Sequence, residues 1–178
     1  MKNTLRIGHI FVLIALAFVV GCSGDSTVTS PPPDPVDPAG TIGVYMDQAG
    51  TNSNITDTGG IVTLYVVHRA PAVTASEFKV EAPTGWILFG AQPQFAVSIG
   101  DIDKGIAIAY GQCLNDVVFL ITLTYQCPGN TPVGESFKVL PRDNGLGRLP
   151  YTEVRVVDCE SNLLFSGVGL ESQVVVVP

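Results

Sequence analysis

Few residues in this chain of 178 could do acid–base or nucleophilic chemistry. His68, one of only two histidines, ends an apolar run beside Arg69, where it could serve as a base only for a thiol such as Cys113. Asp101 and Asp103 form a close carboxylate pair, but nothing around them would separate their pKa values, as paired-carboxylate catalysis requires. The motifs of nucleophile elbows, zinc proteases and phosphate-binding loops are absent. We therefore predict that the protein is not an enzyme.

The acidic turns raise the alternative of a metal site. Asp101 and Asp103 place two hard oxygen ligands just before Gly105, as a calcium loop would, and Asp143 with Asn144 forms a second such pair. Neither pair belongs to the longer ligand series of an EF-hand. A calcium site therefore stays a minor alternative, and we predict neither a metal nor a cofactor.

The four cysteines are Cys22, Cys113, Cys127 and Cys159. Cys113 and Cys127 bracket a predicted strand of about ten residues, roughly 33 Å long at about 3.3 Å per residue. A disulfide tolerates a Cα–Cα separation of only about 7 Å, so these two should not pair. If the strands between residues 117 and 158 alternate in direction, Cys127 and Cys159 emerge at the same end. We predict a Cys127–Cys159 disulfide, with Cys113 left as a buried thiol.

Trp86 is the sole tryptophan, and it follows the turn Pro83-Thr84-Gly85. Two interpretations stay open. A tryptophan at the start of an apolar strand can fill the core. An exposed tryptophan, helped by Tyr45, Tyr110 or Tyr125, could instead stack on the face of a sugar. The second interpretation makes Trp86 a candidate ligand-stacking residue.

The first 21 residues have the layout of an export signal. Lys2 and Arg6 precede an apolar run over 10–20, which is too short to span a bilayer, because spanning takes about 20 residues. Val19-Val20-Gly21-Cys22 resembles the lipobox of bacterial lipoproteins. The resemblance implies removal of 1–21, acylation of Cys22 and anchoring to a membrane of the cell envelope. Ser23 at the next position implies that sorting to the outer membrane is permitted.

Residues 22–40 form a predicted tether between the anchor and the rest of the chain. The segment includes five of the 13 prolines and favours extended polyproline II rather than a packed core. Removing Lys2 and Arg6 with the signal leaves seven basic against 16 acidic residues, a formal charge of −9. Such a charge repels phosphate backbones, and no basic run compensates, so we exclude nucleic acid as a partner.

Residues 41–178 carry the pattern of one all-β domain. Short apolar runs alternate with turn signals, and nowhere does an apolar helical period extend over ten residues. The alternation predicts inward-facing sets such as Phe78 with Val80, and Val117 to Tyr125 at every second position. The predicted strands are 42–46, 61–68, 76–81, 86–90, 95–99, 105–110, 117–126, 134–140, 152–158, 162–166 and 172–177.

The order of these features resembles the cohesin-type jelly-roll sandwich. It runs from SEFKVEAPTGW through GIAIAYG and VVFLITLTYQC to GESFKV and a last strand at the C-terminus. The resemblance implies a single antiparallel β-sandwich that binds a protein partner, with no residue assigned to the binding face. We therefore predict a lipid-anchored binding or assembly module of the bacterial envelope. The alternative is a carbohydrate-binding module that uses surface aromatics.

Overall fold

The computed structural model describes residues 40–143 and 152–176, all within one compact unit of the chain. The predicted signal, Cys22 and nearly all of the tether lie outside these residues, as does Asn144. The described part is built from strands, and it has no helix with the length and apolarity needed to cross a membrane. The strands are β1 (Thr41–Tyr45), β2 (Ile55–Asp57), β3 (Gly60–Glu81), β4 (Ile87–Pro93), β5 (Val97–Asp101), β6 (Gly105–Cys127), β7 (Ser136–Leu140), β8 (Val154–Asp158), β9 (Leu164–Gly169) and β10 (Glu171–Val176).

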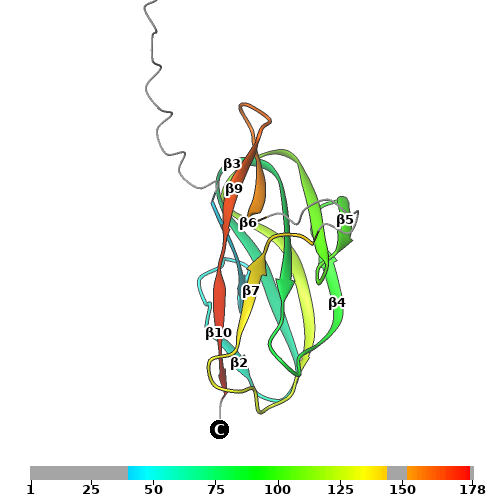
Figure 1. Cartoon of the computed structure of the whole chain (residues 1–178), viewed down its shortest axis with the longest axis vertical. Helices are drawn as coiled ribbons and strands as arrows, with labels where there is room; N and C mark the ends of the chain where they lie inside the picture. The colour runs from blue at the N-terminus through cyan, green and yellow to red at the C-terminus, as the bar shows by residue number, and fades with distance from the viewer. Residues whose placement is uncertain (1–39, 144–151, 177–178) are drawn as a thin grey trace, which may run out of the picture. The chain divides into compact units, whose positions relative to one another are not determined.

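Two strands, β3 and β6, are far longer than the sequence predicted. The predicted strands 61–68 and 76–81 join into the 22 residues of β3, and 105–110 and 117–126 join into the 23 residues of β6. The two pair antiparallel along nearly their whole length and curve together over the upper end of the domain in Figure 1. At the bend, Ala72 and Asp116 have positive φ values and the ladder shifts register. These irregularities let both strands turn the corner without losing their pairing.

The corner divides the structure into two sheets that share β3 and β6. The first sheet holds β1, residues 60–70 of β3, residues 116–127 of β6 and β4. The second holds residues 73–81 of β3, residues 105–114 of β6, β5, β8 and β9. The strand β7 extends this second sheet beside the end of β3, followed by β10 and the short β2. The prediction of a β-sandwich is confirmed, and only β2 was missed.

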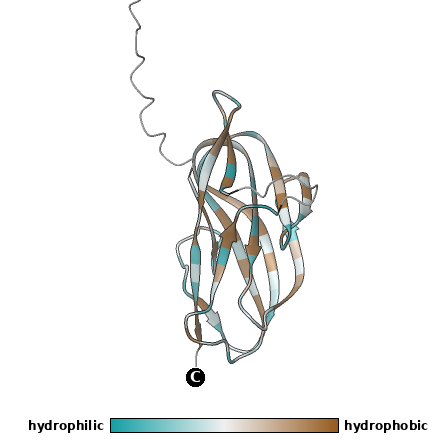
Figure 2. Cartoon of the chain, in the orientation of Figure 1, coloured by the Kyte–Doolittle hydropathy of each residue, from teal (hydrophilic) through white to brown (hydrophobic). Residues whose placement is uncertain are grey.

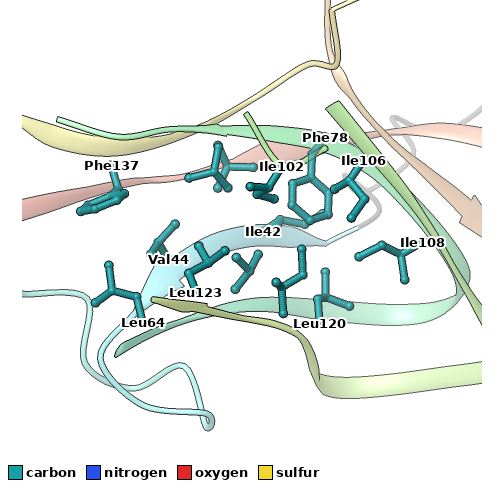
Figure 3. Packing of buried hydrophobic residues seen from close by; sticks show 14 of the residues in the cluster. Ile42, Val44, Leu64, Phe78, Ile102, Ile106, Ile108, Leu120, Leu123 and Phe137 are labelled. Carbon is teal, nitrogen blue, oxygen red and sulfur yellow. The ribbon is translucent and has the colours of Figure 1, made fainter. Parts of the chain in front are cut away.

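The core lies between these sheets. Side chains from both halves of each long strand meet there, with Leu64 and Leu123 from the first sheet facing Phe78 and Ile106 from the second (Figure 3). These side chains are at most 3% exposed. The alternation predicted for Phe78 and Val80 is therefore confirmed. Figure 2 shows apolar residues along all the long strands, and some of them, such as Val97 and Ile99, are exposed.

One predicted alternation fails part of the way along β6. Ile121, Leu123 and Tyr125 are buried as predicted, whereas Val117 is 43% exposed and Phe119 is only half-buried. The cause is a register shift opposite Val66 and Val67, which places the two neighbours Leu120 and Ile121 both in the core. A bulge of this kind moves every residue beyond it to the other face of the sheet.

Candidate binding face

The outer surface of the second sheet carries an exposed row of apolar side chains. The strand registers place Val97, Ala109, Ala75, Val157 and Leu164 side by side across β5, β6, β3, β8 and β9. Residues opposite one another in a ladder share a face. The next residues along these strands, Ile108 and Val156 among them, are buried. The row therefore faces away from the core and crosses these five strands of the second sheet.

A second row lies beside the first on the same side. It consists of Ile99, Ala107, Glu77, Arg155 and Ser166, in the same strand order. We call the apolar members of the two rows the apolar face: Val97, Ile99, Ala107, Ala109, Ala75, Val157 and Leu164.

The apolar face is shaped by residue size. Val97, Ile99 and Leu164 at its two sides are 57%, 66% and 57% exposed, while alanines occupy its centre. Small residues between larger ones leave a shallow hollow of about 180 Å³. Large apolar side chains exposed together on one surface are typical of a contact site for another macromolecule.

Charged residues bound the apolar face along one edge. Arg142 Nη1 donates to Glu77 Oε1 at 2.8 Å, and Lys79 binds Asp143 at 3.0 Å. The Arg142 side chain crosses β6 at Gly105, where a Cβ atom would come within 2.0 Å of Arg142 Cγ. Gly105 also has a φ of 133°, which only glycine adopts readily. Arg142 and Asp143 are thus fixed at the rim of the apolar face.

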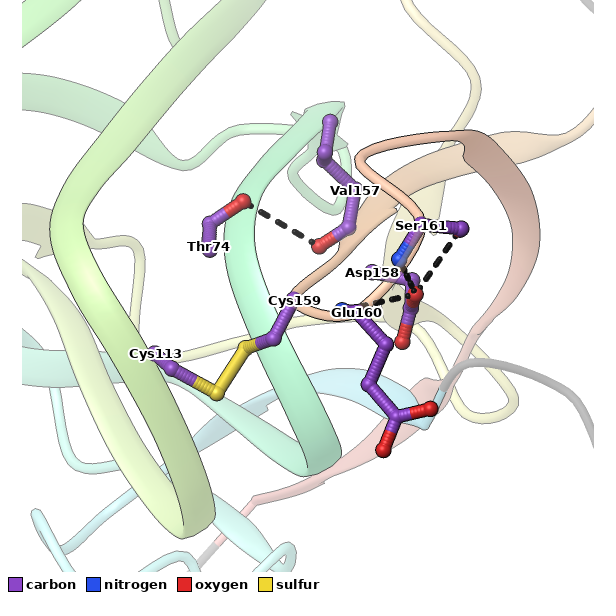
Figure 4. The surroundings of a disulfide bond; sticks show 7 residues. All are labelled: Thr74, Cys113, Val157, Asp158, Cys159, Glu160 and Ser161. Carbon is purple, nitrogen blue, oxygen red and sulfur yellow. Dashed lines mark hydrogen bonds between the residues drawn. A yellow bond between two sulfur atoms is a disulfide. The ribbon is translucent and has the colours of Figure 1, made fainter.

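The disulfide fixes the opposite edge and corrects a sequence prediction. Cys113 pairs with Cys159, with a Cα–Cα distance of 5.5 Å, and Cys127 is free (Figure 4). The predicted Cys127–Cys159 pairing is therefore wrong. The strands do not alternate in direction as predicted, because β7 and β8 both pair antiparallel with the same half of β3 and therefore run the same way. Cys113 also lies in the middle of β6 rather than at its start. Leu114 and Asp158 both pair with Val73, which brings Cys113 and Cys159, the residues next to them, to the same point along β3.

Cys127 lies at the other end of the long ladder, where it pairs with Gly60. Its thiol donates to the Gly60 carbonyl at 3.3 Å, and burial together with the neighbouring Asp57 carboxylate raises its pKa. A raised pKa makes a thiol a poor nucleophile near neutral pH. The prediction of a buried, unreactive free cysteine thus applies to Cys127 instead of Cys113.

Trp86 is buried and does not present its ring to a ligand. It is 8% exposed, its Nε1 donates to Thr131 Oγ1 at 2.8 Å, and its ring packs edge-on against Tyr125 and Phe137. Tyr45, Tyr110 and Tyr125 are each at most 5% exposed. The interpretation of Trp86 as a sugar-stacking residue is therefore wrong. Its ring fills the core, and its polar atom is satisfied there.

His68 and Cys113 do not form the catalytic pair that the sequence left open. His68 is fully buried, and its Nδ1 lies 2.9 Å from the Tyr110 hydroxyl, whose pKa burial raises. The thiol considered as its partner, Cys113, is tied up in the disulfide. Asp101 and Asp103 are both exposed, on either side of the buried Ile102. Within the described ranges, no three His, Cys, Asp or Glu side chains are grouped to hold a metal ion.

Asp57 is a buried carboxylate that has a structural role. It accepts backbone hydrogen bonds from Gly129 at 2.8 Å and Thr131 at 3.0 Å, and a further one from the Thr131 hydroxyl. Burial opposes its ionisation, but the hydrogen bonds outweigh that effect and hold its pKa well below the usual range. The ionised carboxylate thus ties the end of β2 to the loop after β6.

Replacing Asp57 by asparagine should lower the free energy of unfolding by about 2 kcal/mol at pH 7, because charge-assisted hydrogen bonds are lost in a buried site. The folded-state pKa lies below the unfolded value of 3.8, so this contribution is present above pH 4 and is lost as the pH falls further. Urea unfolding at pH 7 and pH 3 should show a smaller pH dependence in Asp57→Asn than in the wild type. Asp103→Asn, at an exposed turn, is the control. If the free energy of unfolding depended on pH equally in the wild type and in Asp57→Asn, the stabilising role of the ionised Asp57 carboxylate would be contradicted.

The sequence did not reveal the apolar face. The segment GIAIAY contains a hint of it, because its isoleucines face the core and its alanines take the alternate, outward positions. Alanine is common on both sides of strands, however, so this alternation alone does not identify a binding surface. What distinguishes these alanines is their alignment with Val97, Val157 and Leu164, which belong to strands far away in the sequence. Only the pairing of the strands brings them into one row.

Comparison with known proteins relates this arrangement to one fold. No family model and no curated protein sequence matches the chain. Among solved structures, the third ScaB cohesin of R. flavefaciens, in complex with a group 1 dockerin, has a TM-score of 0.51 at 12% identity, covering 78% of this chain and 96% of that one. The sixth cohesin of Acetivibrio cellulolyticus scaffoldin B, in complex with a Cel5 dockerin, has a TM-score of 0.52 at 8% identity, covering 78% and 99%. The chain therefore has the jelly-roll β-sandwich fold of cohesin modules.

Proposed function

We propose that this protein is a non-enzymatic binding module that holds a protein partner on the apolar face. The observation that carries the proposal is the uninterrupted apolar row across five strands, from Val97 to Leu164. An apolar patch with a charged rim is the arrangement of protein-binding surfaces. The two cohesins of the same fold were solved in complexes with dockerins. A dockerin-like protein module is accordingly the kind of partner that we propose.

The test is co-purification from the native envelope. The full-length tagged protein, solubilised in detergent, should retain one protein in a fixed stoichiometry that survives size-exclusion chromatography. The retained protein should be lost when the apolar face carries a charge and kept when a remote surface carries the same charge. Capture of many proteins in variable amounts, or capture that ignores the charge on the apolar face, would refute the proposal.

We also propose that the module is anchored to the membrane through Cys22. The lipobox-like Val19-Val20-Gly21-Cys22, the short apolar run before it and the proline-rich tether after it support this proposal. Two or more acyl chains would hold the protein firmly, because a single chain gives only marginal binding. The location that this favours is the bacterial envelope, at the outer membrane.

In the native host, Cys22→Ser should abolish incorporation of labelled palmitate and move the protein from the membrane fraction to the soluble fraction. The cause would be loss of the thiol that carries the lipid. Mass spectrometry of the mature wild-type protein should place the acyl chains on an N-terminal Cys22. Ser23→Ala serves as the matched control and should retain the label. An unmodified Cys22 in the mature wild-type protein would contradict the anchor.

A further inference from the structure

The first sheet has an exposed surface of a different character. Its registers form three outward rows, Ile61–Gln126–Ile87, Thr63–Thr124–Gly90 and Tyr65–Thr122–Gln92, across β3, β6 and β4. The alternate residues in these strands, such as Leu64, Leu123 and Tyr125, are buried. Phe89, which forms a bulge in β4, is 60% exposed. We call this surface the neutral face: Ile61, Thr63, Tyr65, Ile87, Phe89, Gln92, Thr122, Thr124 and Gln126.

The neutral face has no charge. None of its nine residues is Asp, Glu, Lys or Arg, although the chain has 25 such residues and a net charge of −7. Arg69, farther along the same outward side of β3, donates to the Gly50 carbonyl at 2.7 Å. Exposed strands usually carry charged side chains that keep a sheet soluble and monomeric. A sheet surface that omits them in so acidic a protein is complementary to a ligand without charge.

The order of side chains across the neutral face also differs from that of a protein interface. Its central strand, β6, presents Thr122, Thr124 and Gln126 in a line of hydroxyls and an amide. Large apolar groups flank that line on both sides, with Ile61 at 63% exposed on β3 and Ile87 at 56% on β4. Protein interfaces have the reverse order, with an apolar centre and a polar rim.

A glycan chain matches this arrangement. The edges of a sugar ring carry hydroxyl groups, which hydroxyl and amide side chains can both donate to and accept from. The faces of the ring carry C–H groups, which pack on aromatic and aliphatic side chains such as Phe89 and Ile87. A chain lying along β6 would meet both kinds of contact along several sugar units.

We infer that the neutral face binds a neutral glycan chain laid along β6. The inference goes beyond the proposed protein-binding function, because it uses the other sheet and a separate set of side chains. Gln126, Thr124 and Thr122 supply hydrogen bonds to the sugar hydroxyls, and Phe89 supplies the stacking surface.

The test is retention of the full-length, detergent-solubilised protein on insoluble cellulose, chitin and starch, with calcium alginate as an anionic contrast. Retention on at least one neutral polysaccharide and none on alginate is expected. Phe89→Ala should weaken that retention at least tenfold, and Thr124→Glu should abolish it, because it places a charge in the polar line. Val97→Ala, a truncation at a similarly exposed site on the apolar face, should leave it unchanged.

Thermal melts of each variant separate lost binding from lost folding, since both substitutions are at accessible positions. No retention on any of the three neutral polysaccharides would overturn the inference, as would retention that Phe89→Ala and Thr124→Glu leave intact. A concentration-dependent dimer abolished by Thr124→Glu would instead assign the face to a second copy of the chain. Loss of the protein partner would leave glycan retention unaffected, so the two functions can fail separately.

Discussion

Replacing both Cys113 and Cys159 by serine should lower the free energy of unfolding by about 4 kcal/mol, the loop-entropy value for a bridge of this span. The cysteines are separated by 46 positions in the sequence, so the disulfide restricts a long loop of the unfolded chain. For a domain of this size the midpoint of thermal unfolding should fall by about 10–15 °C. Calorimetry or urea unfolding under non-reducing conditions measures the change.

The position of this disulfide gives it a second effect. Only four positions of β8 pair with β3, and Cys159 follows directly, donating its backbone N–H to the Ala72 carbonyl. The bond therefore holds β8 and the turn into β9 against the corner of the two long strands. Val157 and Leu164, which lie on the apolar face, should become more mobile when the bond is absent. Removing the bond should therefore speed amide hydrogen exchange, relative to the wild type, more in residues 154–165 than in β3.

Cys127→Ser is the matched control, because it removes the other described thiol while leaving a hydroxyl donor for the Gly60 carbonyl. It should cost much less stability than the double substitution. Peptide mapping of the oxidised protein should give a Cys113–Cys159 cross-link. A mapped Cys127–Cys159 cross-link, or a double variant as stable as the wild type, would contradict the structure.

Ala109→Arg should reduce binding of the protein partner at least 100-fold while leaving the melting temperature nearly unchanged. Ala109 is exposed at the hollow of the apolar face, between Val97 on β5 and Ala75 on β3. An arginine there fills the hollow, and its charge must be desolvated when the face is covered, which is costly. The exposed position lets the side chain extend into water in the free protein, so folding is not impaired.

The measurement is the amount of partner retained by immobilised full-length protein across a range of partner concentrations. Val133→Arg adds the same charge at a fully exposed loop position and should bind like the wild type. Equal binding by Ala109→Arg and Val133→Arg would exclude the apolar face as the contact surface. Loss of binding in both would indicate a general charge effect rather than a local one.

The sequence by itself determined the fold class. Alternating residues such as Phe78 and Val80, or Ile106 and Ile108, identify strands with one buried side, because successive side chains of a strand point to opposite faces. The same local logic predicts that the apolar run over 10–20 and the proline-rich segment after it lie outside the domain. These features depend on neighbours in the sequence, and so they could be predicted from it.

The tertiary structure decided which distant residues meet. The Cys113–Cys159 pair depends on both cysteines flanking Val73, and the burial of Trp86 depends on Thr131, Tyr125 and Phe137 surrounding it. The two outer faces likewise depend on strand order and on the corner in β3 and β6. Register between strands is set by long-range packing and by bulges, and a shift of one residue reverses every side chain beyond it. For this reason the chain's local pattern predicted a sandwich, and only its folded form revealed an apolar surface on one sheet and an uncharged surface on the other.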